Sequence, residues 1–399
     1  MWNKALDQAL ARLFRIGALE VTYPDGTRRR YGEPGADPVR VTIRDETLPR
    51  RLLLTPDMAL GEAYMNEQLT LDDDDLRGLL LLALTNRRRG HDPGIMRATG
   101  RALTPVQRWL SHNWRAGSKR NVQHHYDLSG ALYDLFLDED RQYSCAYFPE
   151  PDMSLEAAQE AKKRHIARKL LIEPGDRVLD IGCGWGGMAL TLARDFGARV
   201  VGVTLSEEQH RIARERVAQA QLSDRIDIRL QDYREVEGPF ERIVSVGMFE
   251  HVGATHFREY FAKVAELLSP KGVALIHTIG SSSPPRSTSP WIRKYIFPGG
   301  YLPSMSEATR AIEFADLTIT DVEVWRMHYA HTLRHWHDRF MANVDKARDL
   351  YDERFCRMWR YYLTASEVSF IAERLGNFQF QLSHDKTAVP ITRDYLYAD

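Results

Sequence analysis

From about residue 174 the sequence alternates strand-like and helix-like segments, and this order limits the possible folds more than any other feature. The strand-like runs are RVLDIG, RVVGVT, IDIRL, ERIVSVGMF and GVALIHTIG, at residues 177–182, 199–204, 226–230, 241–249 and 272–280. Helices are expected between them at about 187–196, 206–222 and 256–268. This alternation predicts a mostly parallel, doubly wound α/β sheet that binds ligands at the carboxyl ends of its strands. Glu250, directly after the fourth strand, is therefore expected in the active-site crevice.

The first strand is joined to its helix by DIGCGWGG, residues 180–187, which contains three alternating glycines. Glycines at such positions let the backbone turn sharply and approach a ligand closely, although the pattern is weak evidence by itself. A dinucleotide-binding fold would place an acid at the end of the second strand, about 20 residues further on, to bind ribose hydroxyls. Thr204 occupies that position. The missing acid counts against NAD.

The order of motifs after the first three strands fits an S-adenosylmethionine-dependent methyltransferase better. Asp232 resembles the carboxylate that such folds place beside the adenine amine, with an ordinary turn residue as the alternative. Ser206 and Gln209 also form a helix capping box, so they have a purely structural interpretation as well. The cofactor-binding residues predicted from these motifs are Asp180, Gly182, Gly184, Gly186, Thr204, Leu205, Ser206, Gln209, Gln231, Asp232 and Tyr233.

The first 86 residues are expected to form a smaller α+β module without a catalytic constellation. An apolar face at helical spacing runs from Trp2 to Phe14, and strands are expected within residues 19–26 and 39–45. The acidic run at residues 72–75 is expected to be a solvated helix start.

Residues 87–120 contain nine Lys or Arg against the single acid Asp92, with Trp109 and Trp114 among them. Basic residues interleaved with tryptophan suit nucleic acid or the anionic face of a membrane. A solvated linker helix is the alternative. The formal net charge of the chain is -1, so only such a local stretch could favour an anionic partner.

The composition is that of a soluble globular protein, with 43% hydrophobic and 27% charged residues. Three widely spaced cysteines, Cys145, Cys183 and Cys356, suit a reducing compartment and offer no metal-ligand pattern. The longest apolar run, residues 79–84, is far shorter than the roughly 20 residues that span a bilayer. A cytoplasmic protein with at most peripheral contact to the inner membrane surface is expected.

Several motifs around the nucleotide fold resemble one family. HHYDLSGALYDLFLDEDRQYSCAYF precedes it at residues 124–148, and FEHVG, LIHTIG and PWIRKYIFPGGYLPS follow at 249–253, 275–280 and 290–304. With DIGCGWGG, these resemble the cyclopropane-fatty-acyl-phospholipid synthases and their relatives, the mycolic acid cyclopropane synthases. The N-terminal part is more loosely similar to the lipid-binding domain of phospholipid-acting members. The implied domains are a lipid- or membrane-binding domain with its basic linker at 1–110, and a Rossmann-like class I methyltransferase domain at 111–399.

The resemblance implies transfer of a methylene group from S-adenosylmethionine to the cis double bond of an unsaturated phospholipid acyl chain. Bound bicarbonate would be the base, membrane phospholipids the partners rather than nucleic acid, and a homodimer the assembly. One alternative is a relative that gives a methyl-branched or methylene chain without ring closure. A lipid- or cofactor-binding protein without chemistry, and a small-molecule methyltransferase, are further alternatives.

The resemblance also implies site residues. Tyr143 and Ser144 would contact the methionine part of the cofactor. The 290–304 stretch would either help to admit an acyl chain or form a lid that packs on the core. One departure is that YYLTAS places Ser366 where many members have cysteine. The implied bicarbonate cage consists of Cys145, Glu250, His277, the backbone of Ile279, and Tyr329.

Overall fold

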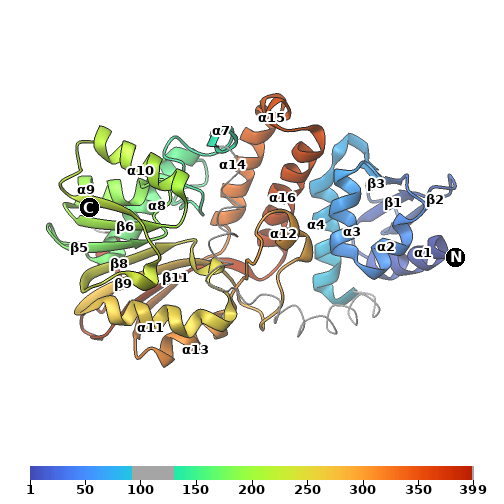
Figure 1. Cartoon of the computed structure of the whole chain (residues 1–399). Helices are drawn as coiled ribbons and strands as arrows, with labels where there is room; N and C mark the ends of the chain where they lie inside the picture. Colours follow the sequence, from blue (N-terminus) through green and yellow to red (C-terminus); the bar gives the residue numbers. More distant parts are fainter. Residues whose placement is uncertain (92–129, 398–399) are drawn as a thin grey trace. The chain divides into compact units, whose positions relative to one another are not determined.

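The computed structural model describes residues 1–91 and 130–397, which divide into two compact units (Figure 1). Each unit combines separate stretches of the chain. Residues 287–297 and 333–374 pack with the N-terminal part in unit 1, whereas the expected division at residue 110 assigned them to the catalytic part. Unit 2 holds residues 111–286, 298–332 and 375–399, as far as they are described.

Unit 1 is built on a four-stranded sheet in the order β2-β1-β3-β4, in which β1 and β3 are parallel and the outer pairs antiparallel. Apolar side chains of the sheet and its helices form one core. The predicted first helix and both predicted strands are present, while β2 was missed because Tyr31 is its only buried residue. The elements are α1 (Trp2–Leu13), β1 (Ala18–Thr22), β2 (Arg28–Gly32), β3 (Pro38–Ile43), α2 (Leu48–Leu54), α3 (Pro56–Met65), β4 (Leu69–Leu71) and α4 (Leu76–Asn86).

Later helices complete unit 1: α12 (Pro290–Tyr295), most of α14 (His328–Ala342), α15 (Val344–Leu350) and α16 (Glu353–Ala372). The acidic run at residues 72–75 is expected to be a solvated helix start. The structure confirms the helix start but not that the whole run is solvated. Asp75 does start a helix, because its side chain accepts from Gly78 N at the start of α4. Asp74 is not merely solvated, since it forms an ion pair with Arg360 of α16. The run therefore ties two helices of this unit together.

Unit 2 contains the predicted doubly wound sheet, with seven strands in the order β10-β11-β9-β8-β5-β6-β7. The strands β5 to β9 are parallel, and β11 lies antiparallel between β9 and β10. The strands are β5 (Arg177–Ile181), β6 (Arg199–Thr204), β7 (Ile226–Leu230), β8 (Phe240–Val246), β9 (Leu268–Ser281), β10 (Thr318–Trp325) and β11 (Leu375–Ser383).

Helices cover both faces of this sheet (Figure 1). One core joins one face to α8, α9 and α10, and a second core joins the other face to α11 and α13. Neighbouring strand residues alternate between the two cores, as Val178 and Leu179 do, because successive side chains in a strand point to opposite faces. The helices are α7 (Gly130–Tyr133), α8 (Leu155–Leu170), α9 (Gly187–Phe196), α10 (Glu207–Gln219), α11 (Phe257–Leu267) and α13 (Met305–Phe314).

The fourth predicted strand ends too late. β8 stops at Val246, and a 3₁₀ turn occupies Phe249–His251. Gly247 has a φ of 69°, a left-handed conformation that glycine adopts without strain, and the chain leaves the sheet there. Glu250 therefore lies on a short turn beyond the strand.

Candidate active site

A pocket lies at the carboxyl ends of β5 to β8, where the doubly wound fold predicts ligand binding. We call it the strand-end pocket. Several predicted cofactor-binding residues line it together, whereas Tyr143, Ser144, Asp180, Gly186 and Ser206 are not among its lining residues. The predicted residues that line it are Gly182, Gly184, Thr204, Leu205, Gln209, Gln231, Asp232 and Tyr233.

The pocket also has walls that the sequence motifs do not assign to the cofactor. Arg234, Met248, His251 and His256 line it. Burial lowers the pKa of His251 to about 4, so this ring is neutral near pH 7. The sequence feature that could have placed His251 in the pocket is its position directly after Glu250, just beyond a parallel strand.

The turn at residues 182–186, here called the glycine turn, is shaped by left-handed backbone conformations. Gly182 has a φ of 80°, and a Cβ added there would lie 3.0 Å from the Met248 side chain. The amides of Gly182 and Cys183 donate to Val203 O at 2.9 and 3.0 Å, which holds the turn against β6. A side chain at residue 182 would therefore be strained and would crowd the pocket wall.

The loop after β6 combines structural and pocket-lining roles. Ser206 caps α10 by accepting from Gln209 N at 3.3 Å. The Thr204 hydroxyl donates to Gln209 Oε1 at 2.9 Å. The structural interpretation of Ser206 is thus present in the fold, while Thr204 and Gln209 line the strand-end pocket.

Asp232 contacts an arginine through both carboxylate oxygens. Arg234 Nε lies 2.9 Å from Oδ1, and its Nη2 lies 2.6 Å from Oδ2. Oδ1 also accepts from the Arg234 amide at 3.0 Å. Asp232 is therefore a turn residue as well as a pocket residue, and its carboxylate is oriented by Arg234.

Glu250 is held by a backbone amide from the neighbouring strand. Its Oε1 accepts from Ile279 N at 2.6 Å, whereas its buried Oε2 has no hydrogen-bond partner among the described residues. Burial raises the pKa of Glu250 to about 7, against the opposing effect of the Ile279 N–H. The Ile279 amide, expected to donate to an anion, donates in this structure to Glu250.

His277 lies on β9 and is 1% exposed. Asn377 Nδ2 lies 3.1 Å from its Nε2, and Gln379 Nε2 lies 3.0 Å from its Nδ1. Burial, with smaller effects from nearby lysines, lowers the pKa of His277 to about 3. A neutral imidazole has one donor and one acceptor nitrogen, and both contact side-chain amides of β11 here.

Cys145 and Tyr329 lie on two segments that are fastened to each other. Cys145 is buried, its Sγ is 3.4 Å from Ala146 O, and burial raises the pKa of the thiol. Tyr329 is buried in the first turn of α14. Its neighbours Thr332 and His328 accept from the amides of Ala146 and Phe148, both at 3.0 Å. Both segments belong to unit 2, with Glu250 and His277.

The aromatic and basic stretch at 290–304 starts within unit 1. Trp291 is 1% exposed and its ring centroid lies 4.6 Å from that of Tyr361. Lys294 Nζ and the Tyr295 hydroxyl both lie within 2.9 Å of Glu62 Oε1. These contacts favour core packing for Trp291 over insertion into a lipid surface.

Ser366 and the basic stretch are the two remaining features that the sequence singles out. Ser366, in place of the family cysteine, lies on α16 of unit 1. Most of the basic stretch, residues 92–120, lies outside the described residues, as do 124–129 of the HHYDLS motif. Arg87, Arg88 and Arg89 are described and exposed.

A pocket above a glycine-rich turn, at the carboxyl ends of the parallel strands, fits the class that the order of motifs indicates, the S-adenosylmethionine-dependent methyltransferases, and the solved structures reported below share this fold. The family model described as mycolic acid cyclopropane synthetase matches residues 115–380. The chain belongs to this family. A second model, described as a domain of unknown function, matches residues 5–89.

Two relatives match nearly the whole chain. The cyclopropane-fatty-acyl-phospholipid synthase of Escherichia coli K12 is 39% identical over 351 residues, which cover 88% of this chain and 89% of that protein. The tuberculostearic acid methyltransferase UfaA1 of Mycobacterium tuberculosis is 38% identical over 385 residues, with 91% and 87% covered. Proteins named for different products are thus almost equally similar to this chain.

Solved structures of the family match the methyltransferase part. Mycolic acid cyclopropane synthase CmaA1, complexed with SAH and CTAB, is 34% identical with a TM-score of 0.63 and covers 66% of this chain and 97% of that one. The cyclopropane synthase MmaA2 from Mycobacterium tuberculosis is 32% identical with a TM-score of 0.64, with the same coverage. Within the described residues, no helix is both long and apolar enough to cross a bilayer.

Proposed function

We propose that this enzyme transfers a methylene group from S-adenosylmethionine to the cis double bond of an unsaturated phospholipid acyl chain, forming a cyclopropane ring and S-adenosylhomocysteine. The E. coli relative, which matches both the N-terminal and the methyltransferase parts of this chain, is named as a cyclopropane-fatty-acyl-phospholipid synthase and supports this substrate class. The observation that carries the proposal is the buried Oε2 of Glu250, which has no hydrogen-bond partner within residues 1–91 and 130–397, in a site that the family model covers.

The chemistry explains why such a site must be dry. An alkene is a weak nucleophile, so it must be held against the sulfonium methyl group where water cannot compete. Addition of the methyl group leaves a carbocation, which closes to the ring only if a proton leaves before water adds. Cys145, Glu250, His277 and Tyr329 are all buried, in keeping with this need.

We further propose that the base is a bound bicarbonate, and the donor set fits one. Glu250 Oε2 lacks a donor among the described residues, and a hydroxyl on the anion would supply it. The Cys145 thiol and the Tyr329 phenol are the side chains proposed to donate to the remaining oxygens, while Ile279 acts by fixing Glu250 Oε1. When bound, bicarbonate supplies a base that takes the proton from carbon.

The proposed role of His277 changes in one respect. Both of its ring nitrogens contact β11 amides, so a direct hydrogen bond to an anion requires His277 to give up one of them. We propose that its main contribution is a neutral, rigid wall.

The second candidate function is methylation without ring closure. It is favoured by the 38% identity to a tuberculostearic acid methyltransferase. The two reactions share binding of the cofactor and the first carbon–carbon bond, and they differ in how the resulting cation is resolved. The proposed cage around Glu250 favours loss of a proton with ring closure.

An assay for S-adenosylhomocysteine tests the proposal. The purified chain is incubated with S-adenosylmethionine and bicarbonate, together with vesicles of either monounsaturated or fully saturated phospholipid. Product should form only with the unsaturated lipid. Cofactor binding without turnover would indicate a binding protein, and equal turnover with both lipids would rule out the double bond as the acceptor.

We also propose peripheral contact with anionic phospholipid, for which the exposed arginines at 87–89 are the described candidates. The cytoplasmic location expected from the sequence and the homodimer implied by the resemblance belong to the same proposal. Sedimentation of the intact chain, with and without vesicles, tests both the assembly and the membrane contact.

A further inference from the structure

Two buried side chains of helix α8, Lys162 and Gln159, donate hydrogen bonds to Gln142 and Ser144, the residues on either side of Tyr143. Lys162 Nζ donates to Gln142 Oε1 at 2.7 Å and to Ser144 Oγ at 2.8 Å. Gln159 Nε2, one helical turn earlier, donates to the carbonyl oxygens of Gln142 and Ser144 at 3.1 and 3.0 Å. Residues 138–145, here called the 138–145 segment, are thereby fastened to α8 through side chain and backbone.

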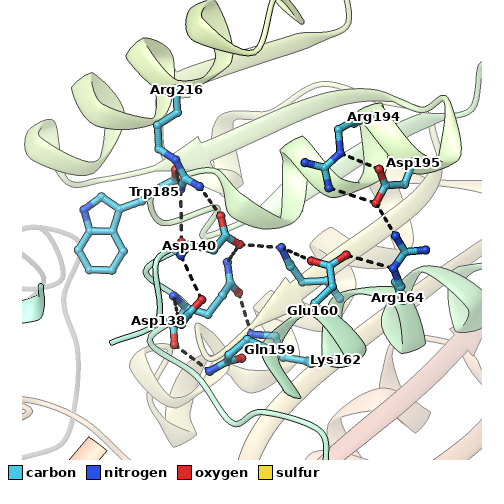
Figure 2. A network of polar contacts seen from close by, with 12 residues as sticks. Asp138, Asp140, Gln159, Glu160, Lys162, Arg164, Trp185, Arg194, Asp195 and Arg216 are labelled. Carbon is cyan, nitrogen blue, oxygen red and sulfur yellow. Dashed lines mark hydrogen bonds and ion pairs between the residues drawn. The ribbon is translucent and has the colours of Figure 1, made fainter. Parts of the chain in front are cut away.

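The same segment is fastened to the glycine turn. Asp140 accepts from Lys163 of α8 at 2.8 Å and forms an ion pair with Arg216 of α10. Arg216 also donates to Trp185 O, within the glycine turn, at 2.7 Å. Figure 2 shows Asp140 between Arg216 and the side chains of α8. One polar network therefore links α8, the 138–145 segment and the glycine turn.

The contact with the start of α9 is close. A Cβ added to Gly187 would lie 2.3 Å from Gln142 Nε2 and 2.4 Å from Asp140 Oδ2. Gln142, which Lys162 holds, thus packs directly against the residue that follows the glycine turn. A shift of the 138–145 segment would change the edge of the cofactor site.

Burying the charged side chain of Lys162 costs more free energy than a purely structural role would explain. This side chain is fully buried, and the hydrogen-bond partners of its Nζ among the described residues are two neutral oxygens. A buried ammonium without a contacting carboxylate carries a large desolvation cost, and burial lowers the pKa of Lys162 to about 8 despite the nearby Asp138. Lys169, equally buried on the same helix, instead lies 2.5 Å from Glu323 Oε2.

We infer that Lys162 is a positioning residue for cofactor binding, which holds Ser144 and the backbone next to Cys145 in place against the glycine turn. The inference rests on the proposed function and on the contact of Tyr143 and Ser144 with the methionine part of S-adenosylmethionine, which the family resemblance implies. Binding is tighter when a site is ordered before the ligand arrives, because less conformational freedom is lost on binding. Lys162 provides that order from outside the strand-end pocket, since it is not among the lining residues.

The test compares Lys162→Met with Lys169→Met, which removes an equally buried lysine from the same helix but leaves the 138–145 segment untouched. S-adenosylhomocysteine binding is measured by calorimetry on the intact chain, and folding by thermal unfolding. Lys162→Met should raise the Kd at least tenfold, whereas Lys169→Met should leave the Kd within twofold while lowering the Tm. Similar Kd values for Lys162→Met and the unmodified chain, or equal losses in both variants, would overturn the inference.

A double-mutant cycle shows whether Lys162 acts through Ser144. The Kd increase from Ser144→Ala should be clearly smaller in the Lys162→Met background than in the unmodified chain. Fully multiplicative effects would contradict the coupling. Should Lys162→Met not fold, Gln159→Leu removes the parallel hydrogen bonds to the same segment and should also raise the Kd, and an unchanged Kd would count against the inference. Failure of the unmodified chain to bind S-adenosylhomocysteine would instead contradict the proposed function.

Discussion

At the scale of single residues, Glu250 has two differently placed oxygens, and this asymmetry defines its expected role. Ile279 N holds Oε1, and Oε2 is buried without a partner among the described residues. Glu250→Gln replaces one carboxylate oxygen by an amide and cannot accept in the same way at both positions. Turnover should fall by up to about 10²–10⁴, the range that a positioned base contributes, because Glu250 is proposed to orient the bicarbonate that acts as the base. The Kd for S-adenosylhomocysteine should change less than about threefold; parallel losses of both would mean that Glu250 shapes the cofactor site.

The raised pKa of Glu250 gives a pH dependence with a definite sign. Above its pKa of about 7 the carboxylate is ionised and can accept a hydroxyl hydrogen bond, so turnover should rise with pH through this region. The profile is measured with free bicarbonate held constant, because bicarbonate is itself lost in acid. The free energy of unfolding should change in the opposite direction. Because the pKa of Glu250 is raised in the folded state, the protonated side chain favours folding, and this stabilisation is lost as pH rises through about 7. A flat turnover profile between pH 6 and 8 would contradict the role of Glu250.

At the scale of elements, α12 is where the structure most changes the meaning of the sequence. The mixture of aromatic and basic residues at 290–297 suited a membrane surface, but Trp291 is buried against Tyr361 and the start of α12 is capped by Ser289. Trp291→Ala should therefore destabilise unit 1 by about 3–5 kcal/mol in denaturant unfolding, as expected for a large buried aromatic side chain. Lys294→Ala, at an exposed ion pair, is the matched mild variant. Unchanged stability with lost vesicle binding would show that Trp291 meets lipid instead.

Strand periodicity located β6 and β7 with their observed ends, because both are short runs of alternating or buried apolar residues bounded by turns. It did not locate β11. The sequence LGNFQFQLS alternates as a half-exposed strand would, yet both faces are buried. Its polar residues face protein groups: Asn377 and Gln379 contact His277, and Gln381 donates to Lys169 O at 2.6 Å. These partners are distant in sequence, so no local pattern reveals them.

The candidate site, like the strands, could be predicted from the sequence only in part. The motifs around Glu250 and His277 predicted which residue types would gather near the ends of β8 and β9, since parallel strands end at a common edge. They could not predict that Ile279 N would already be donated to Glu250, or that both nitrogens of His277 would contact β11. Hydrogen-bond pairing depends on the exact register of β9 and β11, which is a tertiary property.

At the scale of the whole molecule, the net charge of -1 leaves little general attraction to an anionic surface. A local basic cluster must supply it. Combined reversal of Arg87, Arg88 and Arg89 to glutamate should weaken binding to anionic vesicles by more than tenfold at low salt, because each basic residue near such a surface contributes about 1 kcal/mol. Part of any effect at Arg88 is structural, since it donates to Ala372 O at 3.2 Å. Unfolding measurements on the variant control for this, and unchanged vesicle binding would remove the cluster from the proposal.

The most direct measurement is proton NMR of the lipid after reaction. The chain is incubated with S-adenosylmethionine, bicarbonate and monounsaturated phospholipid vesicles, and the acyl chains are examined together with the S-adenosylhomocysteine released. Mass cannot decide, because cyclopropane and methyl-alkene products are isomers. We expect high-field cyclopropane ring protons, one ring for each S-adenosylhomocysteine formed. A stoichiometric yield of S-adenosylhomocysteine with only methyl-branched or methylene signals in the lipid would contradict ring formation.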